Sequence, residues 1–234
     1  DDVDSYTSEV KWAVNSGIIP VNSATKFSPD ASISRIDVVK SLYAFNGYDA
    51  SVNNNSTNND RSKHRNIINS IGYSDLNSSY DDDLDSVVWA YNKGIISKDT
   101  AFNPSVACTR AQLVTMLYRM DGSPQVSGSN PFTDTKEGSW YYNAILWGYN
   151  NGVIKGTTGG KFSPDSKLTK SQLAIFLYRY KNVTKQNFKF KVNVIGGFNN
   201  NGSVYNRNTK YTLVNPTRSG FTFLGWTGSN GKTP

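Results

Sequence analysis

The sequence predicts a mainly α-helical protein built from three copies of one helical unit, followed by a small C-terminal β module. Three observations support this fold class. A set of landmarks recurs three times over residues 1–182, apolar residues within each copy recur at helical spacing, and after Lys181 the spacing changes to strand-like alternation. We divide the chain into repeats 1–50, 71–124 and 131–182, an Asn/Ser-rich insertion at 51–70, and a β module at 187–234.

Each copy begins with a helix that a tryptophan and a glycine mark. The glycine follows the tryptophan by five residues and opens a Gly-Ile-Ile or Gly-Val-Ile segment; the pairs are Trp12 and Gly17, Trp89 and Gly94, Trp147 and Gly152. A glycine there can close the helix in a left-handed conformation. A Phe-x-Pro triplet follows in each copy, at residues 27–29, 102–104 and 162–164.

The second helix of each copy starts five residues after that proline, at Ser34, Thr109 and Thr169. These hydroxyl residues are good N-caps, and Gln112 and Gln172 complete capping boxes. Apolar residues follow at i, i+3, i+4 and i+7, as in Leu113, Met116, Leu117 and Met120. Because a lone helix pair cannot cover such a face, we expect the three copies to share a core.

Charge and composition limit the partners. Lysine and arginine total 25 against 18 aspartates and glutamates, so the net charge of +7 favours a polyanionic partner. Apolar runs fall far short of the roughly 20 residues that cross a bilayer, so we expect no membrane insertion. The single Cys108 excludes an intramolecular disulfide and is expected to be a small packed residue. The start at Asp1 suggests a mature or excised fragment.

The insertion and the tail differ from the repeats. The basic cluster at 61–65 is interpreted as part of a solvated linker, with contact to a polyanion as the alternative. In the tail, residues 188–194 alternate as in a half-buried strand, residues 199–202 signal a turn, and 211–214 and 221–224 predict two more strands. We expect this module to be cut short at Pro234.

The repeated tryptophan, glycine, Phe-x-Pro and Thr-Arg-Ala-Gln landmarks resemble the S-layer homology family over residues 1–182. The resemblance implies a three-repeat helical spindle with pseudo-threefold symmetry. It also implies noncovalent attachment to an anionic secondary cell-wall polysaccharide, often pyruvylated, or to another peptidoglycan-associated polymer of Gram-positive and related bacteria. Residues 214–226 are similar to the Listeria–Bacteroides repeat, a small β-grasp-like module of surface proteins. Both resemblances imply an extracellular location at the bacterial cell wall.

Three cations are the leading candidates for polymer binding. Arg35, Arg110 and Lys170 each stand at the first position of a capped helix, where the helix dipole disfavours a cation by about 0.3 to 1 kcal/mol. A cation beside exposed helix N–H groups would form a site for a carboxylate or a phosphate. The alternative is an ordinary surface cation or one paired with a carboxylate. We expect Arg110→Ala to weaken wall binding without unfolding the chain.

Further candidates come from the aromatic and acidic residues. Trp140 could stack on a sugar ring, whereas the tryptophans of the first helices are expected to pack in the core. Asp75 and Asp134 would hydrogen-bond sugars, as the resemblance implies, or would serve as acidic turns or caps. The resemblance also points to Gly152 and Gly156, of which the second is replaced by Val21 and Lys98 in the other copies.

No catalytic residue, metal or cofactor is expected. Asp81, Asp82, Asp83 and Asp85 do not fit a calcium loop, because Ser86 and Asn92 stand where that loop needs glycine and glutamate. His64 is the only histidine, which excludes histidine-based metal sites and catalytic pairs with serine or cysteine. A carboxylate-based glycosidase, a nucleic-acid binder, and a degenerate scaffold presenting an adhesin-type β module remain alternatives, although the dispersed charge argues against nucleic acid.

Overall fold

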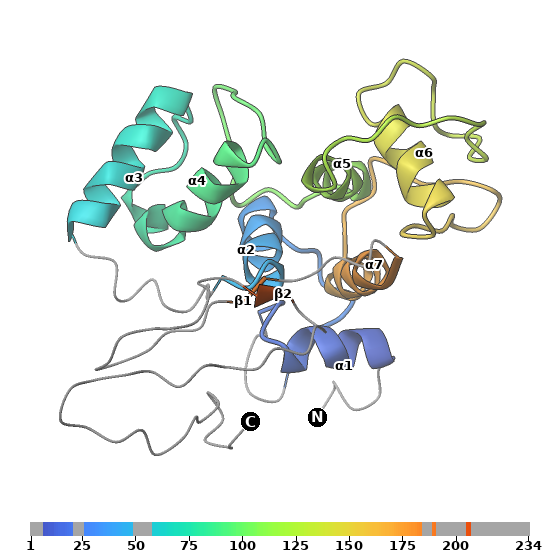
Figure 1. Cartoon of the computed structure of the whole chain (residues 1–234), viewed down its shortest axis with the longest axis horizontal. Coiled ribbons are helices and arrows are strands. Elements are labelled where there is room, and N and C mark those ends of the chain that lie inside the picture. The colour runs from blue at the N-terminus through green and yellow to red at the C-terminus, as the bar shows by residue number, and fades with distance from the viewer. Residues whose placement is uncertain (1–6, 21–25, 49–57, 184–188, 191–204, 207–234) are drawn as a thin grey trace. The chain divides into compact units, whose positions relative to one another are not determined.

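The computed structural model describes residues 7–20, 26–48, 58–183, 189–190 and 205–206. The chain divides into two compact units, residues 1–185 and 186–234. All helices of the described residues belong to the first unit, as Figure 1 shows.

Each repeat contributes two main helices to the first unit. They are α1 (Ser8–Asn15) and α2 (Arg35–Phe45), α4 (Leu84–Asn92) and α5 (Arg110–Met120), and α6 (Tyr142–Asn150) and α7 (Lys170–Val183). The hydroxyl caps form as predicted: Thr109 and Gln112 make a complete capping box, and Thr169 and Gln172 repeat it. In the first copy the Ser34 hydroxyl likewise accepts the N–H of Asp37, at 3.2 Å, and it donates to the Asp37 carboxylate at 2.6 Å.

The repeats pack by pairing helices across their boundaries. The first helix of each copy lies against the second helix of the preceding copy: α4 against α2, α6 against α5, and α1 against α7. The predicted apolar faces are buried in these contacts, from Val38, Leu42 and Phe45 to Leu173, Phe176, Leu177 and Tyr180. The expectation of a shared core is therefore confirmed. Because α1 of the first copy packs on α7 of the third, the three copies form a closed cycle.

Backbone hydrogen bonds close the same cycle at the centre of the first unit. The N–H of Ile33 donates to the carbonyl of Leu168, that of Leu168 to Cys108, and that of Cys108 to Ile33, over 2.8–3.0 Å. All three side chains are at most 2% exposed. Cys108 is thus a small packed residue, as expected, and burial raises the pKa of its thiol to about 12.

The insertion contains a helix, which corrects the interpretation of residues 58–70 as solvated linker. Helix α3 (Asn58–Ile71) packs on α4 and on the short 3₁₀ helix η2 (Ser78–Asp83). Its buried Ile68 and Ile71 supply an apolar contact that the many polar neighbours obscure in the sequence.

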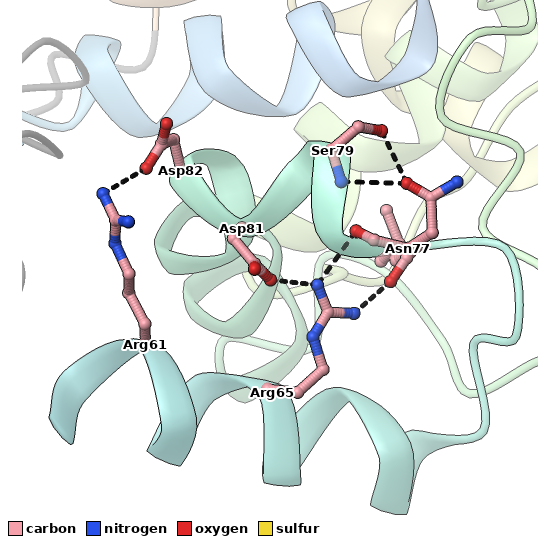
Figure 2. Close-up of polar contacts among 7 residues, drawn as sticks. Arg61, Arg65, Asn77, Ser79, Asp81 and Asp82 are labelled. Carbon is pink, nitrogen blue, oxygen red and sulfur yellow. Dashed lines mark hydrogen bonds and ion pairs between the residues drawn. The ribbon is translucent and has the colours of Figure 1, made fainter. Parts of the chain in front are cut away.

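Ion pairs add to the docking of α3, and they use the acidic residues considered above for calcium. Figure 2 shows Arg61 paired with Asp82, and Arg65 paired with Asp81 and bonded to the carbonyl of Asn77. The Arg61–Asp82 distance is 2.5 Å, and Arg65 also donates to the carbonyl of Leu76. His64 lies 2.5 Å from Asp85, and Lys40 of α2 lies 2.6 Å from Asp83. Most of the basic cluster therefore has intramolecular partners.

In the second unit, the structure describes one antiparallel pair, β1 (Lys189–Phe190) with β2 (Tyr205–Asn206). The first lies within the predicted strand 188–194, and the second was not predicted from the sequence. The predicted turn at 199–202 and the strands at 211–214 and 221–224 lie outside the described residues.

Candidate functional site

The three predicted cations occupy equivalent positions between neighbouring repeats. Each lies over the phenylalanine of the next copy's Phe-x-Pro triplet: Arg35 is 5.1 Å from the ring of Phe102, Arg110 is 4.6 Å from Phe162, and Lys170 is 5.8 Å from Phe27. Each repeat boundary therefore contains a cation that lies over an aromatic ring and forms a cation–π contact with it.

The helix N–H groups beside these cations are not exposed, which corrects the expected anion site. The N–H groups of Arg35 and Ile36 donate to the carbonyls of Val106 and Pro104, at 2.9 and 3.0 Å. Equivalent hydrogen bonds satisfy the first two N–H groups of α5 and of α7. In all three helices the third N–H donates to the hydroxyl of the cap residue. These donors are already satisfied by the protein, so only the side-chain charges remain for a ligand.

Arg110 and Lys170 are buried. They are 4% and 8% exposed. Arg110 donates from Nε to the carbonyl of Phe162 at 2.9 Å and also lies 5.2 Å from the ring of Phe176. Burial lowers the pKa of Arg110, and nearby Asp134 partly offsets this. Lys170 donates from Nζ to the carbonyl of Pro20 at 3.2 Å. Both side chains thus tie neighbouring repeats together.

Arg35 differs from the other two. It is half-buried, its Nε atom is covered without a hydrogen-bond acceptor, and no described carboxylate pairs with it. Its side chain lines two cavities, of about 300 and 180 Å³. Of the three predicted cations, this is the one with a charge open to a ligand.

The larger cavity brings two predicted residues together, since Arg35 and Trp140 both line it. Trp140 is 62% exposed and offers a free aromatic surface. Arg119 adds a second cation, which donates from Nη1 to the carbonyl of Ile95 at 3.2 Å. Arg119 was not predicted as a site residue from the sequence, although Gln112, Thr115 and Arg119 form a polar stripe at i, i+3 and i+7 of α5.

Asp75 and Asp134 hold the Phe-x-Pro loops. The two carboxylate oxygens of Asp75 accept the N–H groups of Phe102 and Asn103 at 2.7 and 2.6 Å, and Asp134 holds Phe162 and Ser163 at 2.8 Å. Asn103 and Ser163 have φ of 58° and 60°, a left-handed conformation that needs such support. The structure thus favours the turn alternative for both aspartates.

The two glycine candidates have steric roles. Gly152 ends α6 with φ of 68°, as predicted. Gly156 has no room for a Cβ, which would lie 2.8 Å from the ring of Phe132 and 2.9 Å from the carbonyl of Lys161. In the second copy Lys98 stands at that position, and the hydroxyl of Tyr73 donates to the neighbouring carbonyl of Ser97 at 2.5 Å.

The tryptophans of the first helices pack between repeats, but of the three only Trp147 lies in the core as predicted. Trp147 is 2% exposed and donates from Nε1 to Asp121 at 3.1 Å. Trp12 and Trp89 are half-buried and meet Tyr178 and Tyr43 edge to face at 5.4 Å. These contacts belong to the α1–α7, α4–α2 and α6–α5 pairs.

The described residues contain neither a metal-ligating cluster nor a helix that could span a membrane. Within residues 7–20, 26–48 and 58–183 and the two short strands, no three histidine, cysteine or acidic side chains are grouped so that they could hold a metal ion. Among the helices of those same residues, none combines the length and the apolar character needed to span a bilayer.

Three helical repeats whose hydrogen bonds close a cycle, with cations at their boundaries, define a three-repeat helical domain. The S-layer homology domain matches residues 1–39, 72–114 and 131–174, which together exceed half of the chain. The chain belongs to the S-layer homology family.

Known relatives match the chain over part of their length. An endoglucanase of Bacillus sp. (strain KSM-635) is 38% identical over 34% of this chain and 8% of its own. The surface-layer 125 kDa protein of Lysinibacillus sphaericus is 33% identical over 36% of this chain and 7% of its own. The S-layer protein sap of Bacillus anthracis is 32% identical over 44% of this chain and 13% of its own.

Each of these three relatives is therefore far longer than the segment it shares with this chain. Relatives with enzyme names match only through the repeats, so the similarity carries no catalytic domain. Family membership and the surface-layer relatives place the chain outside the cell, at the bacterial cell surface. Membership also implies a role in cell-wall anchoring.

Proposed function

We propose that residues 1–182 anchor the chain noncovalently to an anionic secondary cell-wall polysaccharide, which carries pyruvyl groups, at the larger cavity beside Arg35. The observation that carries the proposal is the partly exposed Arg35, which has no ion-pair partner among the described residues and lines a cavity with Arg119 and Trp140. The protein requires no cofactor for this role.

The chemistry of that cavity suits a sugar unit with an acidic substituent. A guanidinium can bind a carboxylate through two parallel hydrogen bonds, which a lysine cannot reproduce. The exposed ring of Trp140 can stack on the C–H face of a pyranose, and Ile95, Ile96 and Met116 provide an apolar lining. The net charge of +7 favours the approach of a polyanion.

The other candidate residues take supporting roles in this proposal. Arg110 and Lys170 join the repeats, while Asp75 and Asp134 set the loops that the cations contact. Gly152 and Gly156 allow the turns after α6. In this proposal, polymer binding depends mainly on Arg35 and not equally on the three predicted cations.

The test is retention on purified Gram-positive sacculi, before and after hydrofluoric acid removes the secondary polymer. Binding should disappear with the polymer, and Arg35→Ala should weaken binding to intact walls by about tenfold or more. Lys93→Ala removes an exposed cation after α4 and serves as the matched control. Equal retention of the Arg35 and Lys93 variants would remove Arg35 from the site.

A second candidate is a degenerate repeat scaffold that presents an adhesin-type β module to a protein or glycan. The burial of Arg110 and Lys170 favours it, because it withdraws two of the three expected cations from ligands. In this alternative, residues 187–234 form the Listeria–Bacteroides repeat-like module. Failure of the repeats to bind walls from several species, with retained binding by the whole chain, would support this candidate.

A further inference from the structure

We infer that an exposed loop of the third repeat, residues 155–161, is a second binding surface, which takes a phosphodiester polymer of the cell wall. None of its residues lines either cavity beside Arg35. The inference therefore goes beyond the proposed function, because it concerns other residues and a different anionic group.

The positive charge of the repeats is concentrated in the third copy. Residues 131–182 contain seven lysines and arginines and three acids, whereas 1–50 and 71–124 each contain four cations and seven acids. This distribution corrects the sequence-based view of a dispersed charge. A polyanion is therefore attracted most strongly to the third copy.

Four lysines of the third copy are exposed and have no ion-pair partner among the described residues. They are Lys136, Lys155, Lys161 and Lys167. By contrast, the acids at 81–83 pair with cations of α2 and α3. The charge of these lysines thus remains available to a partner outside the chain.

The 155–161 loop brings two of these lysines together in a braced hairpin. Thr157 and Lys161 form an antiparallel bridge, in which the N–H and the hydroxyl of Thr157 donate to the carbonyl of Lys161, at 2.6 and 3.1 Å. The N–H of Thr133 donates to the carbonyl of Gly160 at 3.0 Å and ties the hairpin to the segment before α6. Lys155 and Lys161 therefore lie on the two arms of one short loop.

The backbone between the two arms offers free hydrogen-bond donors. Gly159 and Gly160 have φ of 78° and 68°, and a Cβ on either would meet nothing within 4 Å, so conformation and not space requires glycine there. Among the described residues, no acceptor binds the N–H groups of Thr158, Gly159 and Gly160, and all three residues are exposed. Successive free N–H groups in a turn suit the oxygens of a phosphate.

The second copy lacks this arrangement. Its corresponding loop, residues 97–101, is two residues shorter, contains no glycine and includes Asp99. The loop of the third copy has two lysines and no acid. The proposed surface is therefore a property of the third copy and not of the repeated signature.

The chemistry of the hairpin favours phosphate over carboxylate. A lysine ammonium group binds phosphate as a point charge, without the two parallel bonds by which a guanidinium holds a carboxylate. Several weak contacts to successive phosphates of one polymer add to the overall affinity. Because the chain lies at the bacterial cell surface, the accessible phosphodiester is a wall polymer and not a nucleic acid.

Fluorescence anisotropy of labelled poly(glycerol phosphate), titrated with the full chain at several salt concentrations, tests the inference. Each lysine–phosphate contact adds up to about 0.7 to the slope of log affinity against log salt. The double variant Lys155→Ala/Lys161→Ala should lower that slope by about 1 and weaken binding about tenfold at about 0.1 M NaCl. The matched control Lys93→Ala/Lys98→Ala removes the same charge from exposed positions of the second copy and should weaken binding less than about twofold.

Equal losses in the two double variants would show that only net charge matters and would overturn the surface. Equal affinity for a polygalacturonate of the same charge would overturn the choice of phosphate, and tighter binding of a single-stranded oligonucleotide would overturn the choice of a wall polymer. Poly(glycerol phosphate) carries no pyruvyl group, so its failure to bind would leave Arg35-dependent wall retention, and with it the proposed function, unaffected.

Discussion

Replacing Arg110 by alanine should destabilise the repeat unit, and this outcome separates Arg110 from Arg35. From the sequence alone, both residues are expected to be exposed cations, so truncating either one should weaken wall binding without unfolding the chain. In the structure Arg110 is 4% exposed and bonds to a buried carbonyl across a repeat boundary. The two residues occupy equivalent helix positions, so each is the natural control for the other.

The expected magnitude follows from the contacts. Loss of the Nε donor leaves the carbonyl of Phe162 without that hydrogen bond, at a cost of about 1 to 3 kcal/mol. Two aromatic rings lose a cation at 4.6 and 5.2 Å, which adds about 0.5 to 1 kcal/mol each. Removal of a desolvated charge offsets part of this sum, so we expect the free energy of unfolding to fall by about 3 kcal/mol.

The assay is urea and thermal unfolding followed by circular dichroism. A loss of about 3 kcal/mol corresponds to a fall in Tm of about 6 to 12 °C for a unit of this size. Arg35→Ala should lower the free energy of unfolding by less than about 1 kcal/mol, because Arg35 is half-exposed and its Nε has no hydrogen-bond acceptor among the described residues. The reasoning is refuted if Arg110→Ala unfolds at the wild-type midpoint, or if the Arg35 variant is the less stable of the two.

Three further predictions concern other parts of the first unit. Asp134→Ala should lower the free energy of unfolding by about 2 kcal/mol and speed hydrogen exchange of the two loop N–H groups it holds; unchanged exchange would contradict the loop role. The pKa of Cys108 is raised from 9.0 to about 12, so the folded state keeps a proton that the unfolded chain releases. Stability should therefore fall above about pH 9, by up to about 1.4 kcal/mol per pH unit, and Cys108→Ala should flatten that fall in pH-dependent urea unfolding; an equally steep fall in the variant would exclude the thiol. Arg65→Ala should speed exchange in α3 and η2, whereas the more exposed Arg61→Ala should change it little; the reverse order would show that exposure does not rank these contacts.

The helical part of the fold could be predicted because its signals are local and occur three times. Hydroxyl caps, apolar spacing and closing glycines each specify a helix boundary or a buried face within about ten residues of sequence. Helix α3 was missed because its apolar contact rests on Ile68 and Ile71, while the surrounding asparagines and charges resemble a linker.

The site was less predictable, because exposure depends on contacts between repeats. Position in the helix is the same for Arg35, Arg110 and Lys170, yet only the structure shows that the last two are covered. The sequence around Asp75 and Asp134 is compatible with two roles, sugar binding and support of a turn. The loop N–H groups that they bind lie 27 to 29 residues away. Such long-range partners cannot be deduced from a single sequence by spacing alone.

Three copies of one signature therefore do not imply three equal binding sites. A cation that joins two repeats must be desolvated, and that same desolvation removes it from a ligand. The cycle of hydrogen bonds through Ile33, Cys108 and Leu168 requires contacts at each repeat boundary, but it does not require the cation at each boundary to be exposed. Among the described residues, the boundary at Arg35 combines a partly exposed cation with two adjoining cavities. If attachment uses one main site, wall affinity should depend mainly on the boundary at Arg35 and much less on the boundaries at Arg110 and Lys170.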